Sequence, residues 1–422
     1  MLNLKESLVE KVSCLLKERK KLLFDRSLPS PQNKINRSIW VPTIFIMLFV
    51  LVTGVFFQRY LWKISQKQKM TRRLIEKVKN RTMSTPYYLG EIPAPQRFAF
   101  VPYGEDSGLV VGVKKIDIRN VIAPYNASLI RSTTPGYDLF FRYDVISSKA
   151  KYSDFYSRIG VVHLNSQFEQ EDKEFKRIDV HTEYAEDPRV LLVNDQLYIF
   201  YNILNNKNIK NRLMCVANLD KESFKVNYST VLDMNLQWVE KNWSPFEYVG
   251  ADQRPQLLIE YQMSPRKLLN LSDPCTGELK NLMLPQEASY FPLHWSKKWG
   301  EVRGGTPAQK VGDVYLGFFH SSFTEKDGAI WYVMGAYTFE AQPPFRLTGI
   351  SNYPILFRGI FDTPYINTAS SDKRVIFPSG FVLEKQEGRE LIHLTCGEND
   401  SSVKIITLDK EKLLESLNRF EY

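Results

Sequence analysis

Cysteine and histidine are scarce in this chain, and their scarcity excludes several kinds of site. The 422 residues contain four cysteines and five histidines. No CxxC pair is present and the histidines lack metal-ligand spacing, so we expect no metal site. A P-loop, a GxGxxG turn that opens a helix and an HExxH motif are also missing. We therefore expect no cofactor, while one disulfide among Cys215, Cys275 and Cys396 stays open.

Excess charge is confined to one segment. The net charge is +9, and residues 59–81 hold nine basic residues and one acid, which alone contribute +8. The rest of the chain is almost neutral and has no arginine-rich groove or nucleic-acid motif, so we expect no nucleic-acid partner. Hydrophobic residues make up 43% and aromatic residues 13%, which is enough to bury a large core.

Charge is absent from one long run, Ser38–Gln58. About 20 apolar residues in a helix cross a hydrocarbon core of roughly 30 Å, so the run predicts a single-pass anchor and a membrane localisation. A buried core helix and the apolar region of a signal peptide are the alternatives. Basic residues flank both ends, so the side of the membrane stays undecided. The predicted organisation is a tail over 1–37, a transmembrane anchor over 38–58, a basic stalk or linker over 59–95 and a β domain over 96–422.

Long helical periodicity is nearly absent after residue 98, where short apolar segments alternate with turn residues. The exception is a short leucine stripe near the end, which predicts one helix. Five units begin with a proline followed by a short apolar strand, a polar turn and an aromatic-rich strand. These prolines are Pro124, Pro188, Pro245, Pro307 and Pro378, at spacings of 64, 57, 62 and 71 residues. With about four strands per unit, the pattern predicts an all-β, five-bladed β-propeller, and a pair of sandwiches is the alternative.

A propeller would bring residues near the start of its innermost strands to one mouth of the central channel. The residues gathered there would be Asn126, Asp187, Arg189, Lys241, Asn242, Arg303, Thr306 and Ser379. Considered alone, Glu186 and Asp187 would be interpreted as a solvated turn, and each cation as a surface charge. Together, Arg158, Arg189, Lys241, Arg303 and His320 would form an anion site, although His320 also suits a core histidine.

Sugar chemistry needs a proton donor for the departing glycosidic oxygen, and a carboxyl group among fixed cations can serve. Aromatic rings can stack on the apolar face of a sugar. Most of the 26 Phe and 22 Tyr must form the core. Trp243, beside Lys241 and Asn242, is the ring that we expect in the pocket.

Several motifs carry a resemblance to a known family. They include "PYNASLI", "YSRIGVVHLN", "EDPRV", "EKNWSPF" and "GGTPAQKVGDVYLGFFHSS", in this order over Phe98–Asp409. The chain resembles the five-bladed propeller glycosidases and phosphorylases, most closely the β-mannoside phosphorylase family (glycoside hydrolase family 130) and its related β-1,2-mannosyltransferases. "LNSQ" and "HSS" depart from the family's usual motifs, so phosphorylase and transferase both stay open.

The resemblance implies a role for individual residues. Asp187 would be the proton donor, Arg158, Arg189, Lys241 and His320 would bind phosphate, and Asn126 would contact sugar. With the pocket reasoning above, this predicts sugar contacts for Asn126, Glu186, Asn242, Trp243 and Thr306, and anion contacts for Arg303. The expected function is an inverting, membrane-anchored carbohydrate-active enzyme that makes or breaks β-mannosyl linkages. Its partners would be a glycan and either inorganic phosphate or a nucleotide-sugar. A non-catalytic propeller that binds glycans or proteins is the alternative.

Overall fold

The computed structural model describes residues 53–54, 57–59, 61, 94–146, 155–182, 184–204, 212–232, 237, 239–364 and 373–420. The chain divides into two compact units, Met1–Gln66 and Lys67–Tyr422. The described residues of the first unit are helical and exposed. Most of the predicted anchor and most of the predicted stalk lie outside the described residues, and the predicted domain boundaries stay predictions.

The structure corrects the predicted localisation. A membrane-spanning helix needs about 20 predominantly apolar residues. In the part of the chain that the structure describes, no helix is both long enough and apolar enough to cross a membrane. The single-pass membrane localisation, and the membrane as a partner, are therefore not supported.

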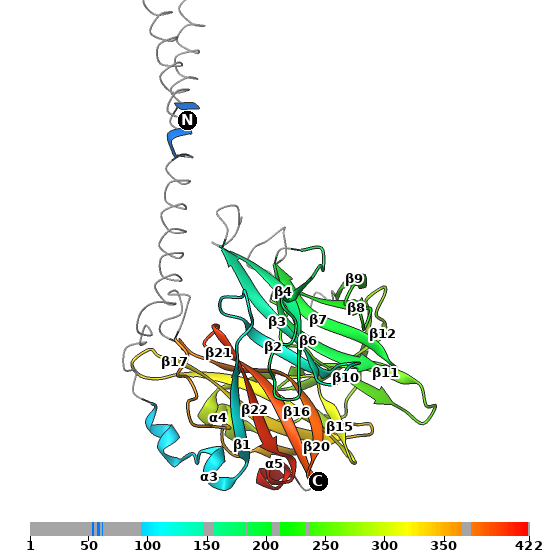
Figure 1. Cartoon of the computed structure of the whole chain (residues 1–422). Coiled ribbons are helices and arrows are strands. Elements are labelled where there is room, and N and C mark those ends of the chain that lie inside the picture. The colour runs from blue at the N-terminus through cyan, green and yellow to red at the C-terminus, as the bar shows by residue number, and fades with distance from the viewer. Residues whose placement is uncertain are drawn as a thin grey trace, which may run out of the picture. The chain divides into compact units, whose positions relative to one another are not determined.

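The described residues of the second unit form β-sheets with a few short helices (Figure 1). Four of its sheets have four antiparallel strands each. The first contains β2 (Tyr125–Arg131), β3 (Tyr137–Ile146), β4 (Phe155–Leu164) and β5 (Lys176–Ile178). The second contains β6 (Ala185–Val193), β7 (Gln196–Leu204), β8 (Arg212–Leu219) and β9 (Val226–Leu232). The third contains β10 (Ser244–Val249), β11 (Pro255–Met263), β12 (Arg266–Asp273) and β13 (Glu278–Leu282).

The last four-stranded sheet joins both ends of the β domain. It contains β1 (Val110–Ile116), β22 (Ser402–Asp409), β21 (Arg389–Glu398) and β20 (Ile376–Gln386), in this spatial order. β1 pairs with β22, so the first strand of the domain completes the last sheet.

A larger sheet of seven strands stands between the third and the last of these sheets in chain order. It contains β14 (Glu301–Gly304), β15 (Gln309–Val311), β16 (Val314–Thr324), β17 (Ile330–Glu340), β18 (Leu347–Ser351), β19 (Lys373–Arg374) and β23 (Leu417–Arg419). Only β19 pairs in parallel among its described strands. The short helices are η1 (Gln96–Phe100), α3 (Gly104–Ser107), η2 (Gln286–Ala288), α4 (Leu293–Trp299) and α5 (Lys410–Ser416).

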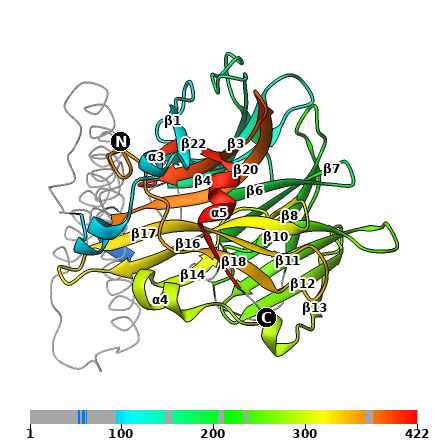
Figure 2. The ribbon, with the colours of Figure 1, turned by 90° about the horizontal axis from the view of Figure 1, so that it is seen from below.

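The sheets pack around a ring. β2 packs against β6 and β20, β6 packs against β10, β11 against β14, and β16 against β20 (Figure 2). Apolar clusters fill the spaces between neighbouring sheets, for example Phe140 and Ile159 of the first sheet with Val190 and Ile199 of the second. Inner strands are buried on both faces, as in β6, whereas the outer strand β9 alternates between exposed and partly buried residues. These observations confirm an all-β, propeller-like fold.

The predicted repeats map onto the sheets with one irregularity. The units that begin at Pro124, Pro188, Pro245 and Pro378 give the four regular sheets, whereas the unit at Pro307 falls in the seven-stranded sheet. Four regular blades are therefore found where five were predicted. The leucine stripe forms α5, whose N-cap Asp409 accepts a hydrogen bond from the Lys412 amide. Cys215, Cys275 and Cys396 are free.

Candidate functional site

Three inner strands begin at residues with a left-handed backbone. Asn126, Asp187 and Asn242 have φ values of 47°, 55° and 65°. Asn126 and Asp187 lie in bulges, where the pairing of β2 with β3 and of β6 with β7 shifts register. A positive φ is uncommon outside glycine, and Asn and Asp tolerate it best. Bulges re-aim side chains, and this backbone strain concentrates at functional sites.

Asp187 is buried at this position, and hydrogen-bond donors lie around its carboxylate. Its Oδ1 accepts a hydrogen bond of 2.8 Å from Nδ2 of Asn126 and one of 3.1 Å from Nη1 of Arg142. Burial raises the pKa of Asp187, but Arg142, the Asn126 hydrogen bond and Arg189 outweigh it and lower the pKa to about 2. Asp187 is therefore a carboxylate at neutral pH.

Arg142 is a central residue of this cluster that the sequence did not single out. It lies on β3 opposite Tyr125, and its guanidinium stands 4.8 Å from the centre of that ring. Its Nη1 is 3.1 Å from Oε2 of Glu186, and its Nε donates to Oγ of Ser157 at 2.9 Å. Arg142 ends the segment "GYDLFFR", which belongs to the family resemblance, but no role was assigned to it. Its place across the hairpin from Tyr125 is the further signal that could have found it.

Glu186 is held by two arginines. Its Oε2 lies 3.1 Å from Nη1 of Arg142 and 2.6 Å from Nη1 of Arg212 on β8. Arg212 was also missed by the sequence. Glu186 was predicted to contact sugar, and in the structure it is buried with its Oε2 between two arginines that offset its charge.

Arg189 and Thr306 point into the protein. Arg189 is fully buried, with Nε donating to the carbonyl of Gly305 and Nη2 lying 3.3 Å from the carbonyl of Gly304 and 3.5 Å from Oδ1 of Asn242. Burial lowers the pKa of Arg189 to about 10. Oγ1 of the buried Thr306 accepts from the Phe318 amide. Arg189 therefore holds the backbone at Gly304 and Gly305, where β14 of the seven-stranded sheet ends.

A cleft of about 440 Å³ lies beside this cluster. Lys241, Asn242, Arg303 and Gly304, four residues near the predicted mouth, line it together with Tyr261. Lys241 is exposed, and Nη2 of Arg303 is 3.9 Å from Oε2 of Glu301. Desolvation lowers the pKa of Lys241, while Asp187 and Glu186 oppose the shift, so the ammonium shares an electrostatic environment with the buried carboxylates. Two cations and one acid, Glu301, line the cleft, so its net charge is positive.

His320 lies next to the same cations. It pairs in register with Arg303 across β14 and β16, and its ring centre is 4.5 Å from that of Phe377. Burial, followed by Arg189, Arg303 and Lys241, holds its pKa well below the ordinary value, so the imidazole is neutral. Its Nδ1 is buried and has no hydrogen-bond partner in the described part of the chain. A buried polar atom of this kind calls for a ligand or a water.

The structure does not bring all predicted residues to the mouth. Trp243 belongs to the core between the second and third sheets, where Nε1 donates to Glu240 and the ring packs against Tyr261. Arg158 lies on β4 opposite Tyr143, with its guanidinium 5.7 Å from the centre of the Tyr156 ring. Ser379 is buried, and its Oγ has no partner in the described region.

A second carboxyl group was missed. Asp400 lies in the turn between β21 and β22, with φ of 46°. Burial raises its pKa to about 6, Asp187 and Asp144 add to the rise, and Arg142 opposes it. Asp187 and Asp400 are thus two interacting carboxyl groups whose pKa values are displaced in opposite directions. Such pairs can divide the proton donor and acceptor roles of a reaction.

Comparisons with known proteins give fold-level likenesses only. No family model and no curated sequence matches this chain. A β-1,2-mannobiose phosphorylase from Listeria innocua is 16% identical, with a TM-score of 0.49 over 74% of this chain and 97% of that chain. A mannose phosphorylase from Leishmania mexicana, in complex with phosphate ion, is 14% identical, with a TM-score of 0.49 over 75% and 94%. A GDP-Man-dependent mannosyltransferase from Leishmania mexicana is 13% identical, with a TM-score of 0.47 over 72% and 92%. Likenesses at this level decide neither activity nor substrate.

Proposed function

We propose that the chain is a carbohydrate-active enzyme that makes or breaks β-mannosyl-type linkages with inversion. We further propose that the seven-stranded sheet acts as the fifth blade of its propeller. The observation that carries the proposal is the position of Asp187, a buried carboxylate on a strained bulge, beside a cleft lined by Lys241 and Arg303. A fixed carboxylate next to a cationic cleft suits proton transfer at a sugar oxygen combined with binding of a phosphate.

The proposed step in the direction of synthesis uses Asp187 as a base. The acceptor hydroxyl oxygen attacks the anomeric carbon of the donor sugar while its proton passes to Asp187. The bond to the leaving phosphate or nucleoside diphosphate breaks, and that group departs with the electron pair. Lys241 and Arg303 stabilise the added charge, and the neutral His320 offers a hydrogen bond. A pKa of about 2 keeps Asp187 in the form that accepts a proton.

Breakdown is the same step reversed. A phosphate oxygen attacks the anomeric carbon, the glycosidic bond breaks, and the departing oxygen takes a proton from Asp187. For this direction the pKa of Asp187 must rise, and a bound anion nearby would raise it. In the proposal Asn126 and Asn242 contact the sugar, while Glu186, Arg189 and Thr306 hold the surrounding backbone and charges. Trp243 lies in the core between two sheets and takes no part in the proposed step, and Arg158 stays a predicted phosphate-binding residue.

A product assay tests the proposal. The chain is incubated with β-linked mannosides, with and without inorganic phosphate, and separately with a nucleotide-mannose donor and mannoside acceptors. We expect mannose 1-phosphate in the first case or an elongated mannoside in the second, each with inverted anomeric configuration. Binding of mannosides without any turnover across the panel would contradict an enzyme and favour a glycan-binding propeller.

A further inference from the structure

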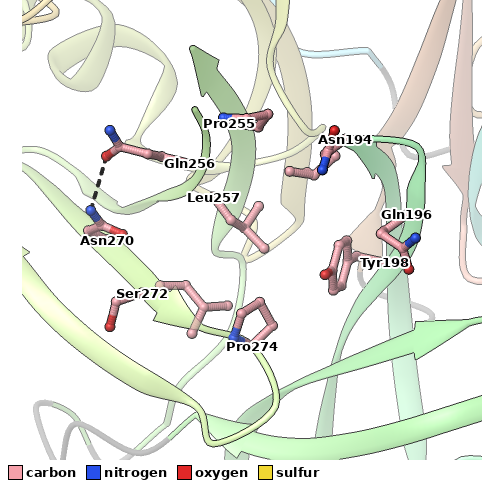
Figure 3. A pocket seen from close by; sticks show the side chains of 11 residues that line it. Asn194, Gln196, Tyr198, Pro255, Gln256, Leu257, Asn270, Ser272 and Pro274 are labelled. Carbon is pink, nitrogen blue, oxygen red and sulfur yellow. Dashed lines mark hydrogen bonds between the residues drawn. The ribbon is translucent and has the colours of Figure 1, made fainter. Parts of the chain in front are cut away.

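A second cleft lies between the second and third sheets, away from Asp187. Its volume is about 370 Å³, and it is formed where β6 ends, β7 and β11 begin and β12 ends (Figure 3). Val193 lines it, whereas Asp187 stands near the start of the same strand. Six residues of strand, at about 3.3 Å each, separate the two positions by about 20 Å. The second cleft is therefore distinct from the proposed mouth.

The walls of the second cleft are polar but uncharged. None of the eleven described residues that line it carries a charge, and four of them are amides. These amides are Asn194, Gln196, Gln256 and Asn270. Gln196 lies beside Tyr198 on one wall, Gln256 and Asn270 lie on the facing wall, and Pro274 lies between the walls (Figure 3). The cleft thus combines hydrogen-bonding groups with flat apolar rings.

Three of the four amides make side-chain hydrogen bonds while part of each stays unused. Nδ2 of Asn270 donates to Oε1 of Gln256 at 3.2 Å, and Nδ2 of Asn218 lies 3.5 Å from Oε1 of Gln196. Nε2 of Gln256 and Oδ1 of Asn270 make no hydrogen bond within the described part of the chain. The amide pair thus offers one donor and one acceptor at fixed positions.

The two acids nearest in sequence are occupied elsewhere, and the exposed Arg254 beside Pro255 does not line the cleft. Oδ1 of Asp195 lies 2.5 Å from Nζ of Lys221. Asp273 accepts hydrogen bonds from the Cys275 amide and the Thr276 hydroxyl within its own turn. A phosphate or a carboxylate would find no cation among the lining residues, and an ammonium ligand would find no carboxylate there. The ligand that matches the walls is therefore uncharged.

We propose that the second cleft is a separate binding site for a neutral oligosaccharide. Sugar hydroxyls are both donors and acceptors, as are the amides, and the C–H face of a pyranose matches the rings of Tyr198 and Pro274. Small-ligand sites commonly combine apolar walls with a few placed polar groups. The binding itself does not depend on the proposed catalysis.

Hydrogen exchange read by mass spectrometry tests the site on the full chain. The probes are mannotetraose, cellotetraose and xylotetraose, with tetragalacturonate as a charged counterpart. We expect at least one neutral probe to slow exchange in peptides spanning 194–204 and 255–272, with no such effect from tetragalacturonate. With Tyr198→Ala or Gln256→Lys, at least tenfold more probe should be needed to give the same protection. Tyr290→Ala, at an exposed tyrosine that does not line the second cleft, is the matched control and should leave it unchanged.

Three results would overturn the proposal. The first is an absence of protection with every neutral probe, and the second is protection confined to peptides around Asp187 and Lys241. The third is undiminished protection in both Tyr198→Ala and Gln256→Lys. Because the readout resolves each peptide, loss of the second site is distinguishable from failure of the proposed enzymatic activity, which concerns the mouth alone.

Discussion

Asn126 and Asp187 are 61 residues apart in the chain and joined by a hydrogen bond of 2.8 Å. Both residues have a left-handed backbone, at a cost of about 1–3 kcal/mol each. Such conformations persist only where neighbouring structure enforces them. The orientation of the Asp187 carboxylate is therefore set by the first sheet as well as by its own.

Replacement of Asp187 by asparagine tests the assignment of the base. Asp187→Asn keeps the shape and tolerates the positive φ, but it removes the proton acceptor. We expect turnover to fall by roughly 10²–10⁴-fold, the usual contribution of a positioned acid or base. Arg142 keeps Glu186 as a partner, so the chain should stay folded, but the melting temperature should fall because the lowered pKa means that the charged form of Asp187 stabilises the fold. Activity close to that of the parent chain would exclude Asp187 from this role.

Arg142 is expected to act on the reaction through the pKa of Asp187. Arg142→Gln removes the largest contribution that lowers this pKa, so it should rise from about 2 toward or above the ordinary value. The acid limb of the pH–kcat profile for synthesis should then move to higher pH. Arg358→Gln, at an exposed arginine paired with Asp106, is the matched control and should leave the profile in place. An unshifted acid limb in Arg142→Gln would show that Arg142 does not tune Asp187.

Lys241 and Arg303 should govern affinity for the anionic substrate. We expect Lys241→Met and Arg303→Gln each to raise KM for phosphate or the nucleotide-sugar by roughly 10- to 100-fold, since a charge-assisted contact contributes about 1.5–3 kcal/mol. KM for the neutral sugar should change less. Lys267→Met, at an exposed lysine on β12, serves as the control for loss of a surface charge. Equal effects in Lys241→Met and Lys267→Met would argue against an anion site.

Gly397 is expected to be intolerant of a side chain because Asn126 fills the space beside it. A Cβ at Gly397 would collide with Oδ1 and the backbone nitrogen of Asn126, whereas at Gly112 in the same sheet it would meet nothing nearer than 3.8 Å. Gly397→Ala should therefore displace Asn126 and reduce activity at least tenfold, while Gly112→Ala should not. Comparison of kcat and melting temperature for the two variants separates a local effect from unfolding.

Asp400 should make the stability of the chain depend on pH. Its pKa in the folded state is about 6, above the ordinary 3.8, so its protonated form stabilises the fold. This contribution is complete below pH 4 and is lost as the pH rises through 6. Asp400→Asn keeps a residue that tolerates the positive φ and never ionises. Its melting temperature should exceed that of the parent chain at pH 7.5, and the difference should shrink by pH 4. A difference in melting temperature that does not vary with pH would show that the pKa of Asp400 is not raised.

The repeat pattern predicted much of the ring, because each Pro-led unit has a local signal. Pro124 and Pro188 mark strand starts, and the neighbouring Asn126 and Asp187 fall on bulges at the same end of the sheets. The burial of Arg189 was not predictable, because its partners are carbonyl groups more than 100 residues away. Arg142 and Asp400 were missed for a similar reason. Their importance comes from strand register and from a turn, and neither leaves a motif in the sequence.

Trp243 shows a second limit of prediction from the sequence. Its neighbours Lys241 and Asn242 line the cleft beside Asp187, yet its own ring is buried between two sheets. The left-handed backbone at Asn242, with φ of 65°, interrupts the regular alternation of an extended chain between Lys241 and Trp243. Closeness in sequence to a functional residue therefore does not place a side chain in the same site.

The pairing of β1 with β22 has a consequence for biosynthesis. β1 leaves the ribosome before the other strands of the ring, and its hydrogen-bonding partner emerges almost 300 residues later. Until then β1 lacks its only partner strand among the described sheets, and the edge that will pair with β22 stays open to foreign strands. The ring of sheets can therefore close only when translation is nearly complete. A chaperone that shields β1 during that interval would raise the yield of folded protein.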